Sequence, residues 1–320
     1  MLNNKKVNIF LLIIAIVLFI FLPRFLSGYW VRVITTIFMY AVIAQGMNIM
    51  SGYMGYLPFG NAMFFGIGAY VTAIGMSKGL SFLVVVPLAV ITAILFSVLL
   101  GIPVLRLRGH YFAIATIGMS AAILSVVQNA TEITGGAMGT TLPIINKAPG
   151  VVYNYFYLAM FGLMIITTLS LYFIIKSKFG FGIRSIKANE EAANSMGINT
   201  TYHKVVAWAI SALFTSIAGA LYAYWMSFIA PDEVFDVMIA VNTIVIMLIG
   251  GAGSILGPII GAFIIELFAE IAWSSFLEYH LAVLGIIIIV IVFFVPKGVT
   301  GTFGDFVKKR KLRVGKKVSI

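Results

Sequence analysis

The residues whose types and spacing point to a function lie in the long polar stretch 176–204. Asn189 is placed to cap a short helix there, because its side-chain oxygen can accept a free backbone N–H of the first turn. Carboxylates that follow the cap face the positive end of the helix dipole, and a glycine in the left-handed conformation can end the helix. This pattern predicts an exposed helix of about two turns, although the letters Glu-Ala-Ala alone also fit a solvated connector. The candidate residues are Glu190, Glu191, Ala192, Ala193 and Gly197.

Glu266 and Glu270 form a second acidic pair, one helical turn apart within an apolar segment. A carboxylate inside a membrane is a candidate functional group, and Glu266 could bind the ammonium of a ligand. The alternatives are a protonated carboxyl or a hydrogen bond within the bundle. Catalytic and metal chemistry are not expected, because the chain has no cysteine and its 3 histidines have no metal-ligand spacing. Gly-Lys occurs once, before another lysine, so the Walker phosphate loop is missing.

Neutral polar residues and glycines within apolar segments could line a passage for an uncharged or zwitterionic solute. Two glycine clusters, at 52–68 and 250–261, permit close approach of helices or expose backbone groups beside a cavity. Tight packing and pathway lining both stay open, and they are compatible. The candidate pathway residues are Gln45, Asn48, Gly60, Asn61, Gly66, Thr116, Asn242 and Glu266.

The composition requires lipid as the solvent of the elements that position these residues. Of the 320 residues, 62% are hydrophobic and 10% are charged, and the mean hydropathy is +1.10. Soluble domains carry about 25% charged residues. The sequence therefore predicts an all-α polytopic membrane bundle of about ten spans of roughly 20 residues. They are expected at 7–22, 31–50, 61–77, 80–105, 111–128, 151–175, 205–229, 236–250, 255–273 and 281–296.

Basic residues predict the orientation, because Lys and Arg concentrate on the cytoplasmic side. With both termini inside, 17 of the 21 basic residues lie in cytoplasmic loops or tails, and stretch 176–204 is cytoplasmic too. Their positions beside spans argue against nucleic acid as the partner. Arg106 and Arg108 are interpreted as anchoring charges of this kind. The four outside residues are Arg24, Arg32, Lys78 and Lys147.

Three features of the organisation also follow from the sequence. Residues 51–60 could be a short loop or a re-entrant segment. The glycine-rich joins after the second and eighth spans suggest an internal repeat, with spans one to four copied in spans seven to ten. We expect a transmembrane domain at 1–304 and a basic cytoplasmic tail at 305–320.

Several motifs, taken in order from about residue 45 to 300, resemble the permease subunit of branched-chain amino acid ABC importers. In that superfamily the Glu-Ala-Ala loop docks into the ATP-binding subunit. Two departures, Gly60-Asn61-Ala62 for Gly-His-Ala and 55–58 for Gly-Gln-Leu-Ser, leave the exact substrate open. The motifs are GNAMFFGIGAY (60–70), RLRGHYFAIAT (106–116), TGGAMG (134–139), GIRSIKANEEAANSMGIN (182–199), AGALYA (218–223), GGAGSILGPIIGA (250–262) and VPKG (295–298).

The resemblance implies a multi-pass permease of a bacterial or archaeal plasma membrane that moves Leu, Ile or Val inward. It implies a second permease subunit, two ATP-binding subunits and an extracytoplasmic substrate-binding protein as partners. The chain itself would be no enzyme and would bind no cofactor, because ATP would bind to the partner subunits. Residues 190–193 and Gly197 would couple the chain to the ATP-binding subunits. The alternatives are a urea or short-amide importer and a stand-alone channel or secondary transporter.

Overall fold

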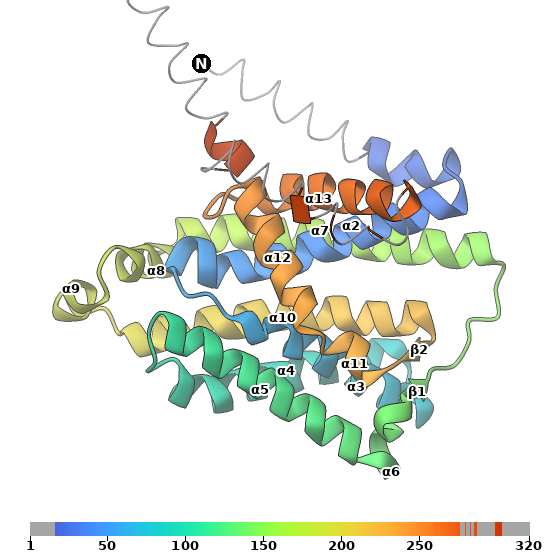
Figure 1. Ribbon diagram of the computed structural model, residues 1–320, viewed down its shortest axis with the longest axis horizontal. Helices are drawn as coiled ribbons and strands as arrows, with labels where there is room; N and C mark the ends of the chain where they lie inside the picture. The colour runs from blue at the N-terminus through green and yellow to red at the C-terminus, as the bar shows by residue number, and fades with distance from the viewer. Residues whose placement is uncertain (1–16, 276–278, 280–281, 283–284, 287–297, 303–320) are drawn as a thin grey trace, which may run out of the picture.

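The computed structural model describes residues 17–275, 279, 282, 285–286 and 298–302, and this part of the chain is almost wholly helical (Figure 1). Its short helices are η1 (Leu22–Arg24), the π-helix η2 (Ile49–Met54), η3 (Phe59–Asn61), α6 (Thr131–Thr134), η4 (Gly136–Met138), α8 (Lys178–Ala188), α9 (Glu190–Ser195) and α11 (Pro231–Val234). The long helices are α2 (Gly28–Asn48), α3 (Ala62–Ser77), α4 (Phe82–Val104), α5 (His110–Asn129), α7 (Pro149–Lys176), α10 (Thr200–Met226), α12 (Val237–Gly250) and α13 (Gly257–Ser275). Two strands, β1 (Thr140–Thr141) and β2 (Phe228–Ile229), pair antiparallel.

Eight helices in the described part are long and apolar enough to cross a membrane, and they correspond to the second to ninth predicted spans. The all-α membrane bundle is therefore confirmed. Most of the predicted spans 7–22 and 281–296 falls outside the described residues, and the tail 305–320 lies wholly outside them. The number ten, the orientation and the boundary between domain and tail stay predictions.

Two groups of long helices make up the bundle. Helices α7 and α13 both pack against α2, while α10 packs against α3 and α4. Helix α12 runs obliquely between the two groups and contacts α2 and α13 (Figure 1). Helices α8 and α9 project from one end of the bundle, and the β1–β2 pair, α6 and α11 lie at the opposite end. We call these the α9 end and the β end.

Small residues let α3 and α10 approach closely at the centre of the fold. A Cβ added to Gly68 would lie 2.0 Å from the carbonyl oxygen of Ser216, and one added to Gly219 would lie 2.1 Å from that of Phe65. No side chain fits at either position, so the two backbones touch. Van der Waals contact of this kind replaces the hydrophobic effect as the force that joins helices in lipid.

Residues 51–60, left open between a loop and a re-entrant segment, form the junction of two helices. The π-helix η2 continues α2 to Met54, and Gly55, with φ +86°, ends it. A short turn and the helix η3 lead directly into α3. The boundary predicted for the seventh span was wrong at its end: α10 stops at Met226, because Ser227 has φ +60° and residues 228–229 pair with β1.

Candidate functional site

The loop between α7 and α10 contains the predicted capped helix, α9. Asn189 Oδ1 accepts a hydrogen bond of 3.0 Å from the backbone N–H of Ala192 and so caps the first turn. Gly197 has φ +86°, and the next N–H, of Ile198, turns back to the carbonyl of Ala193 at 3.0 Å. The helix is therefore closed at both ends by its own sequence, and its exit direction depends on the left-handed glycine.

Glu190 faces inward and joins the loop to the spans. Its carboxylate lies 2.6 Å from Lys204 Nζ and 3.5 Å from Arg108 Nε, and it accepts a hydrogen bond from the Tyr56 hydroxyl. Lys204, only 4% exposed, also donates to the Leu105 carbonyl at 2.8 Å. Four segments thus meet at one ammonium: α9, α10, the turn before α5, and the junction between α2 and α3.

The charges around Glu190 decide its protonation. Its burial acts to raise the pKa of the carboxyl. Hydrogen bonds from Lys204 and Tyr56, together with the positive charges of Lys204 and Arg108, outweigh this effect and hold the pKa of Glu190 below its ordinary value of 4.5. The carboxylate is therefore ionised at neutral pH, and the ion pair is intact.

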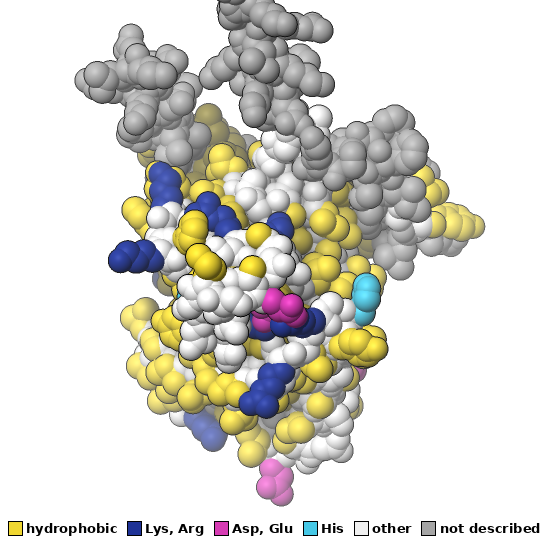
Figure 2. Space-filling model, turned by 90° about the vertical axis from the view of Figure 1, so that its left-hand side faces the viewer, with side chains coloured by type: hydrophobic (Ala, Val, Ile, Leu, Met, Phe, Trp, Pro, Cys, Tyr) yellow, Lys and Arg dark blue, Asp and Glu magenta, His cyan; other side chains and the backbone are white. Residues whose placement is uncertain are grey.

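Glu191 and most of α9 face outward, whereas Ala193 is buried. The Glu191 side chain is 79% exposed, and one oxygen lies 2.9 Å from Arg108 Nη1. This hydrogen bond raises the pKa of the Arg108 guanidinium above its ordinary value. Met196 at the end of the helix is 83% exposed. The α9 end therefore offers a convex surface with an exposed apolar side chain, and Figure 2 shows Lys and Arg side chains around a small acidic group there.

Sequence reasoning missed α8, which packs the loop against the bundle. Its Ile183 and Ile186 are buried, and their spacing of three residues is the signal that could have found an amphipathic helix. Lys187 on α8 donates to the carbonyl of Gly52 at 2.6 Å. Arg108, interpreted from the sequence as an anchoring charge, belongs to the same set of contacts through its two glutamates. Helices α8 and α9 are thus both fixed to the junction between α2 and α3.

Three of the candidate pathway residues make hydrogen bonds between helices. Gln45 donates to the Thr168 hydroxyl at 2.8 Å. Asn48 bonds two backbone groups of the turn 250–256, accepting from one and donating to the other, each at 2.8 Å. Asn61 bonds two hydroxyl groups on α10, each at 3.2 Å. The structure therefore places all three in interhelical contacts, and Asn48 brings together the two joins on which the predicted repeat rests.

Three further candidates lie where helices cross. A Cβ on Gly60 would lie 1.9 Å from the carbonyl oxygen of Thr116, and one on Gly66 would lie 2.4 Å from the Phe235 ring. The Thr116 hydroxyl, fully buried, donates to the carbonyl of its own helix at 2.8 Å. These positions hold η3 against α5 and α3 against the segment after α11.

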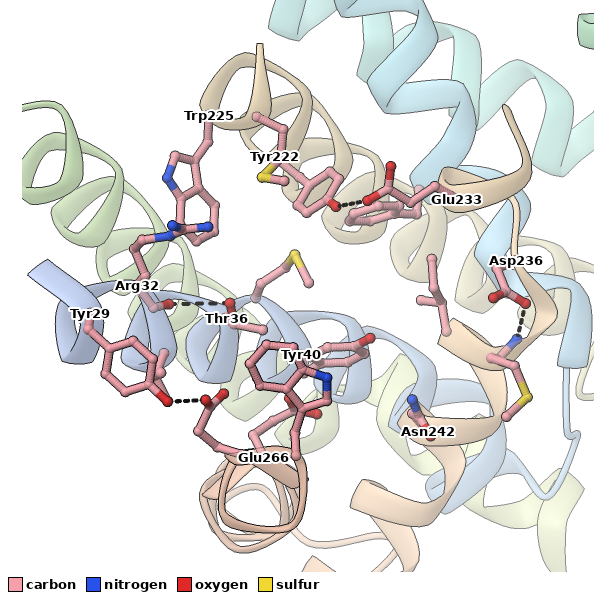
Figure 3. Close-up of a pocket in the computed structure, with 18 residues that line it drawn as sticks. Tyr29, Arg32, Thr36, Tyr40, Tyr222, Trp225, Glu233, Asp236, Asn242 and Glu266 are labelled. Carbon is pink, nitrogen blue, oxygen red and sulfur yellow. Dashed lines mark hydrogen bonds between the residues drawn. The ribbon is translucent and has the colours of Figure 1, made fainter. Parts of the chain in front are cut away.

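Asn242 and Glu266, the remaining two candidates, lie together in a cavity of about 720 Å³. The cavity is bounded by α2, the end of α10, α11, α12 and α13 (Figure 3). It lies toward the β end, because α11 is at that end (Figure 1). Besides Glu266, its wall contains three further carboxylates and one guanidinium. They belong to Glu233, Asp236, Glu270 and Arg32. Sequence reasoning assigned Arg32 only to an outside loop and gave it no role in a pathway.

Comparison with known proteins shows a similarity that covers most of the chain. Residues 29–292 match the family described as branched-chain amino acid transport system, permease component. The high-affinity branched-chain amino acid permease protein LivM of Salmonella typhimurium is 29% identical over 92% of this chain and 75% of its own length. Its Escherichia coli K12 counterpart is 28% identical over the same shares, and LivH of that strain is 26% identical over 82% of this chain and 91% of its own. No solved structure matches the chain. The chain therefore belongs to the branched-chain amino acid transport permease family, as a multi-pass membrane subunit that works with other components of an ABC transport system.

Proposed function

We propose that this permease moves branched-chain amino acids inward across the plasma membrane and is driven by ATP hydrolysis on separate subunits. The observation that carries the proposal is α9: a capped, exposed helix, joined through Glu190 to a buried lysine of α10. A helix that serves only as a connector does not require an ion pair to a span. The substrate class rests on the family and on the permeases named above.

Helix α10 provides the mechanical link between loop and cavity. Its second turn carries Lys204, which holds α9, and its last turns carry Tyr222 and Trp225, which line the cavity. At 1.5 Å per residue, its 27 residues span about 40 Å. A displacement of α9 by an ATP-binding subunit would therefore move the wall of the cavity through one continuous helix that is packed against α3 and α4.

The partners in this proposal are a second permease subunit, two ATP-binding subunits and an extracytoplasmic substrate-binding protein. Glu191 and Ala192 on α9 and Met196 directly after it, all exposed, would form the surface that the ATP-binding subunit contacts. Gly197 would fix the angle at which this surface is presented. The chain itself would supply no nucleotide site, in keeping with the missing Walker sequence.

Competition in the assembled transporter tests the substrate. We expect uptake of labelled leucine to be inhibited by unlabelled isoleucine and valine and to be unaffected by urea. Full uptake of urea or a short amide, with none of the three amino acids, would move the chain to the amide importers. ATP-independent uptake through the purified chain alone would instead favour a channel or secondary transporter.

A further inference from the structure

The cavity between α2, α10, α12 and α13 combines features of a binding site that the interhelical contacts do not explain. Its volume of about 720 Å³ lies within the roughly 300–1,000 Å³ typical of small-molecule sites. The last turns of α10 and part of α11 line it, so it lies toward the β end, far along α10 from the α9 end. A solute that arrives at the β end would therefore meet this cavity before it reached the packed centre of the bundle.

One guanidinium and several carboxyl groups line the cavity, and the side chains of Arg32 and Glu266 have no hydrogen-bond or ion-pair partner among the described residues. Arg32 makes no ion pair with any described residue, and its guanidinium carbon lies 5.9 Å from the centre of the Tyr153 ring. Among the carboxylates, Glu233 accepts from Tyr222 at 2.6 Å, and Glu270 accepts from Tyr29.

Asp236 caps α12 by accepting from its backbone at 2.8 Å. Glu266 accepts no hydrogen bond from the described residues. Figure 3 shows Arg32 and Glu266 on different walls of the same space, with Thr36 and Tyr40 between them. The cavity therefore offers one guanidinium and one carboxyl group for which the described part of the chain supplies no hydrogen-bonding partner. Arg32 is exposed and Glu266 is partly exposed, so a solute in the cavity can reach both groups.

The rest of the lining is suited to an aliphatic group. Trp225 and Trp273 supply indole surfaces, and Met39, Phe65 and Ile239 supply apolar surface. Binding sites for small molecules combine such a lining with a few placed polar groups. A bare cation would gain nothing from this surface, and a fatty acid would have no use for Glu266.

We propose that this cavity binds the zwitterion of an α-amino acid during transport. Arg32 pairs with the ligand carboxylate, Glu266 accepts from its ammonium, and the tryptophans contact the branched side chain. The inference rests on the proposed function and specifies the site through which that function acts. Both ligand charges then keep partners when they leave water, which a zwitterion requires in order to enter a bundle of apolar helices.

Tryptophan fluorescence reports on this cavity directly, because it contains two of the 4 tryptophans of the chain. The full chain in lipid nanodiscs is titrated with leucine, with 4-methylpentanoate, which lacks the ammonium, and with 3-methylbutylamine, which lacks the carboxylate. We expect saturable quenching that is lost when Trp225 and Trp273 are replaced by Phe. Leucine should bind at least about 10-fold more tightly than either analogue, since a hydrogen bond to a charged group contributes that much.

Two variants assign the charges. Glu266→Gln should weaken leucine about 10-fold and leave 4-methylpentanoate nearly unchanged, while Arg32→Gln should weaken leucine and leave 3-methylbutylamine nearly unchanged. The matched controls are Glu132→Gln and Arg24→Gln, exposed residues that do not line the cavity. These controls should bind all three ligands as the native chain does.

The outcomes separate the site from the function. Absence of saturable quenching by leucine, or equal binding of leucine and both analogues by the native chain, overturns the inference without reference to any variant. Native leucine binding in both Glu266→Gln and Arg32→Gln also overturns it. If the assembled transporter carries leucine while the cavity does not bind it, the proposed function stands and the site fails. If the cavity binds leucine with the expected pattern but the transporter does not carry it, the site stands and the proposed function fails.

Discussion

Lys204→Met is expected to release α9 from the spans while the bundle stays folded. The Lys204 ammonium lies 2.6 Å from Glu190, 2.8 Å from the Leu105 carbonyl and 3.2 Å from the Tyr56 hydroxyl. Methionine fills a similar volume but offers none of these hydrogen bonds. The loss therefore falls on the contacts between α9 and the bundle, while the apolar packing of α10 against α3 and α4 is retained.

The size of the effect follows from burial. Removing one member of a buried ion pair costs about 3–5 kcal/mol, because the other charge is left without a partner. Here the Glu190 side chain is 14% exposed and keeps Arg108 at 3.5 Å, so we expect a value near the lower end, about 3 kcal/mol. At about 1.4 kcal/mol per factor of ten, the open population of α9 should rise about 100-fold.

Hydrogen exchange measures this population, because amides that are protected by α9 exchange when the helix opens. The N–H groups of Ala193 and Ile198 are hydrogen-bonded at 3.0 Å within α9 and its closing turn. Their exchange should be up to about 100-fold faster in Lys204→Met, whereas amides in the middle of α10 should be unchanged. In the assembled transporter the same variant should lower the amount of leucine moved per ATP hydrolysed.

Lys178→Met is the matched control. Lys178 lies in the same loop, is exposed, and makes no hydrogen bond or ion pair with the described residues. The Lys178→Met variant therefore loses the same positive charge as Lys204→Met but breaks no buried ion pair. Equal exchange of Ala193 and Ile198 in the two variants would refute the view that Lys204 holds α9 to the spans.

Three further predictions follow from the same geometry. Gly197→Ala should leave membrane abundance unchanged but lower transport and co-purification of the ATP-binding subunit. Nothing lies within 4 Å of an added Cβ, but a residue with a side chain at φ +86° is destabilised by about 1–2 kcal/mol. Gly150→Ala, also open but without positive φ, is its control, and identical behaviour of the two variants would count against a role for Gly197. Reporter fusions at Lys147 and in the tail 305–320 should report opposite sides of the membrane, and same-side results would rule out the predicted topology. Because the pKa of Glu190 is lowered, its ion pair stabilises docking above pH 4.5 and is lost as the pH falls through the lower folded value. Exchange at Ala193 should thus be flat from pH 8 to 5 after correction for the intrinsic rate, and a rise near pH 6 would contradict this assignment.

Local signals in the sequence were enough to predict the ends of α9 and most spans. The cap at Asn189 and the left-handed Gly197 depend on residues within one turn, and apolar length alone marks a membrane helix. The partners of Glu190 could not be found this way, because Tyr56 and Arg108 come from segments far away in the chain. Their contact depends on how the helices pack.

The candidate pathway shows a different limit. A neutral polar residue in a span can line a cavity or join two helices, and the residue type is the same in both cases. Gln45, Asn48 and Asn61 make interhelical hydrogen bonds, whereas Asn242 and Glu266 line the cavity. Which of these applies is decided by the direction of each side chain in the assembled bundle, and the sequence does not contain that information in any local pattern.

The central claim is that this chain carries substrate only as part of an ATP-driven assembly, and uptake into proteoliposomes tests it most directly. Vesicles containing this chain, a second permease subunit and the ATP-binding subunits, supplied with the substrate-binding protein, should accumulate labelled leucine against its gradient when ATP is present. Accumulation should stop when ATP, the ATP-binding subunits or this chain is left out. Concentrative leucine uptake by this chain alone, without any ATP-binding subunit, would contradict the claim.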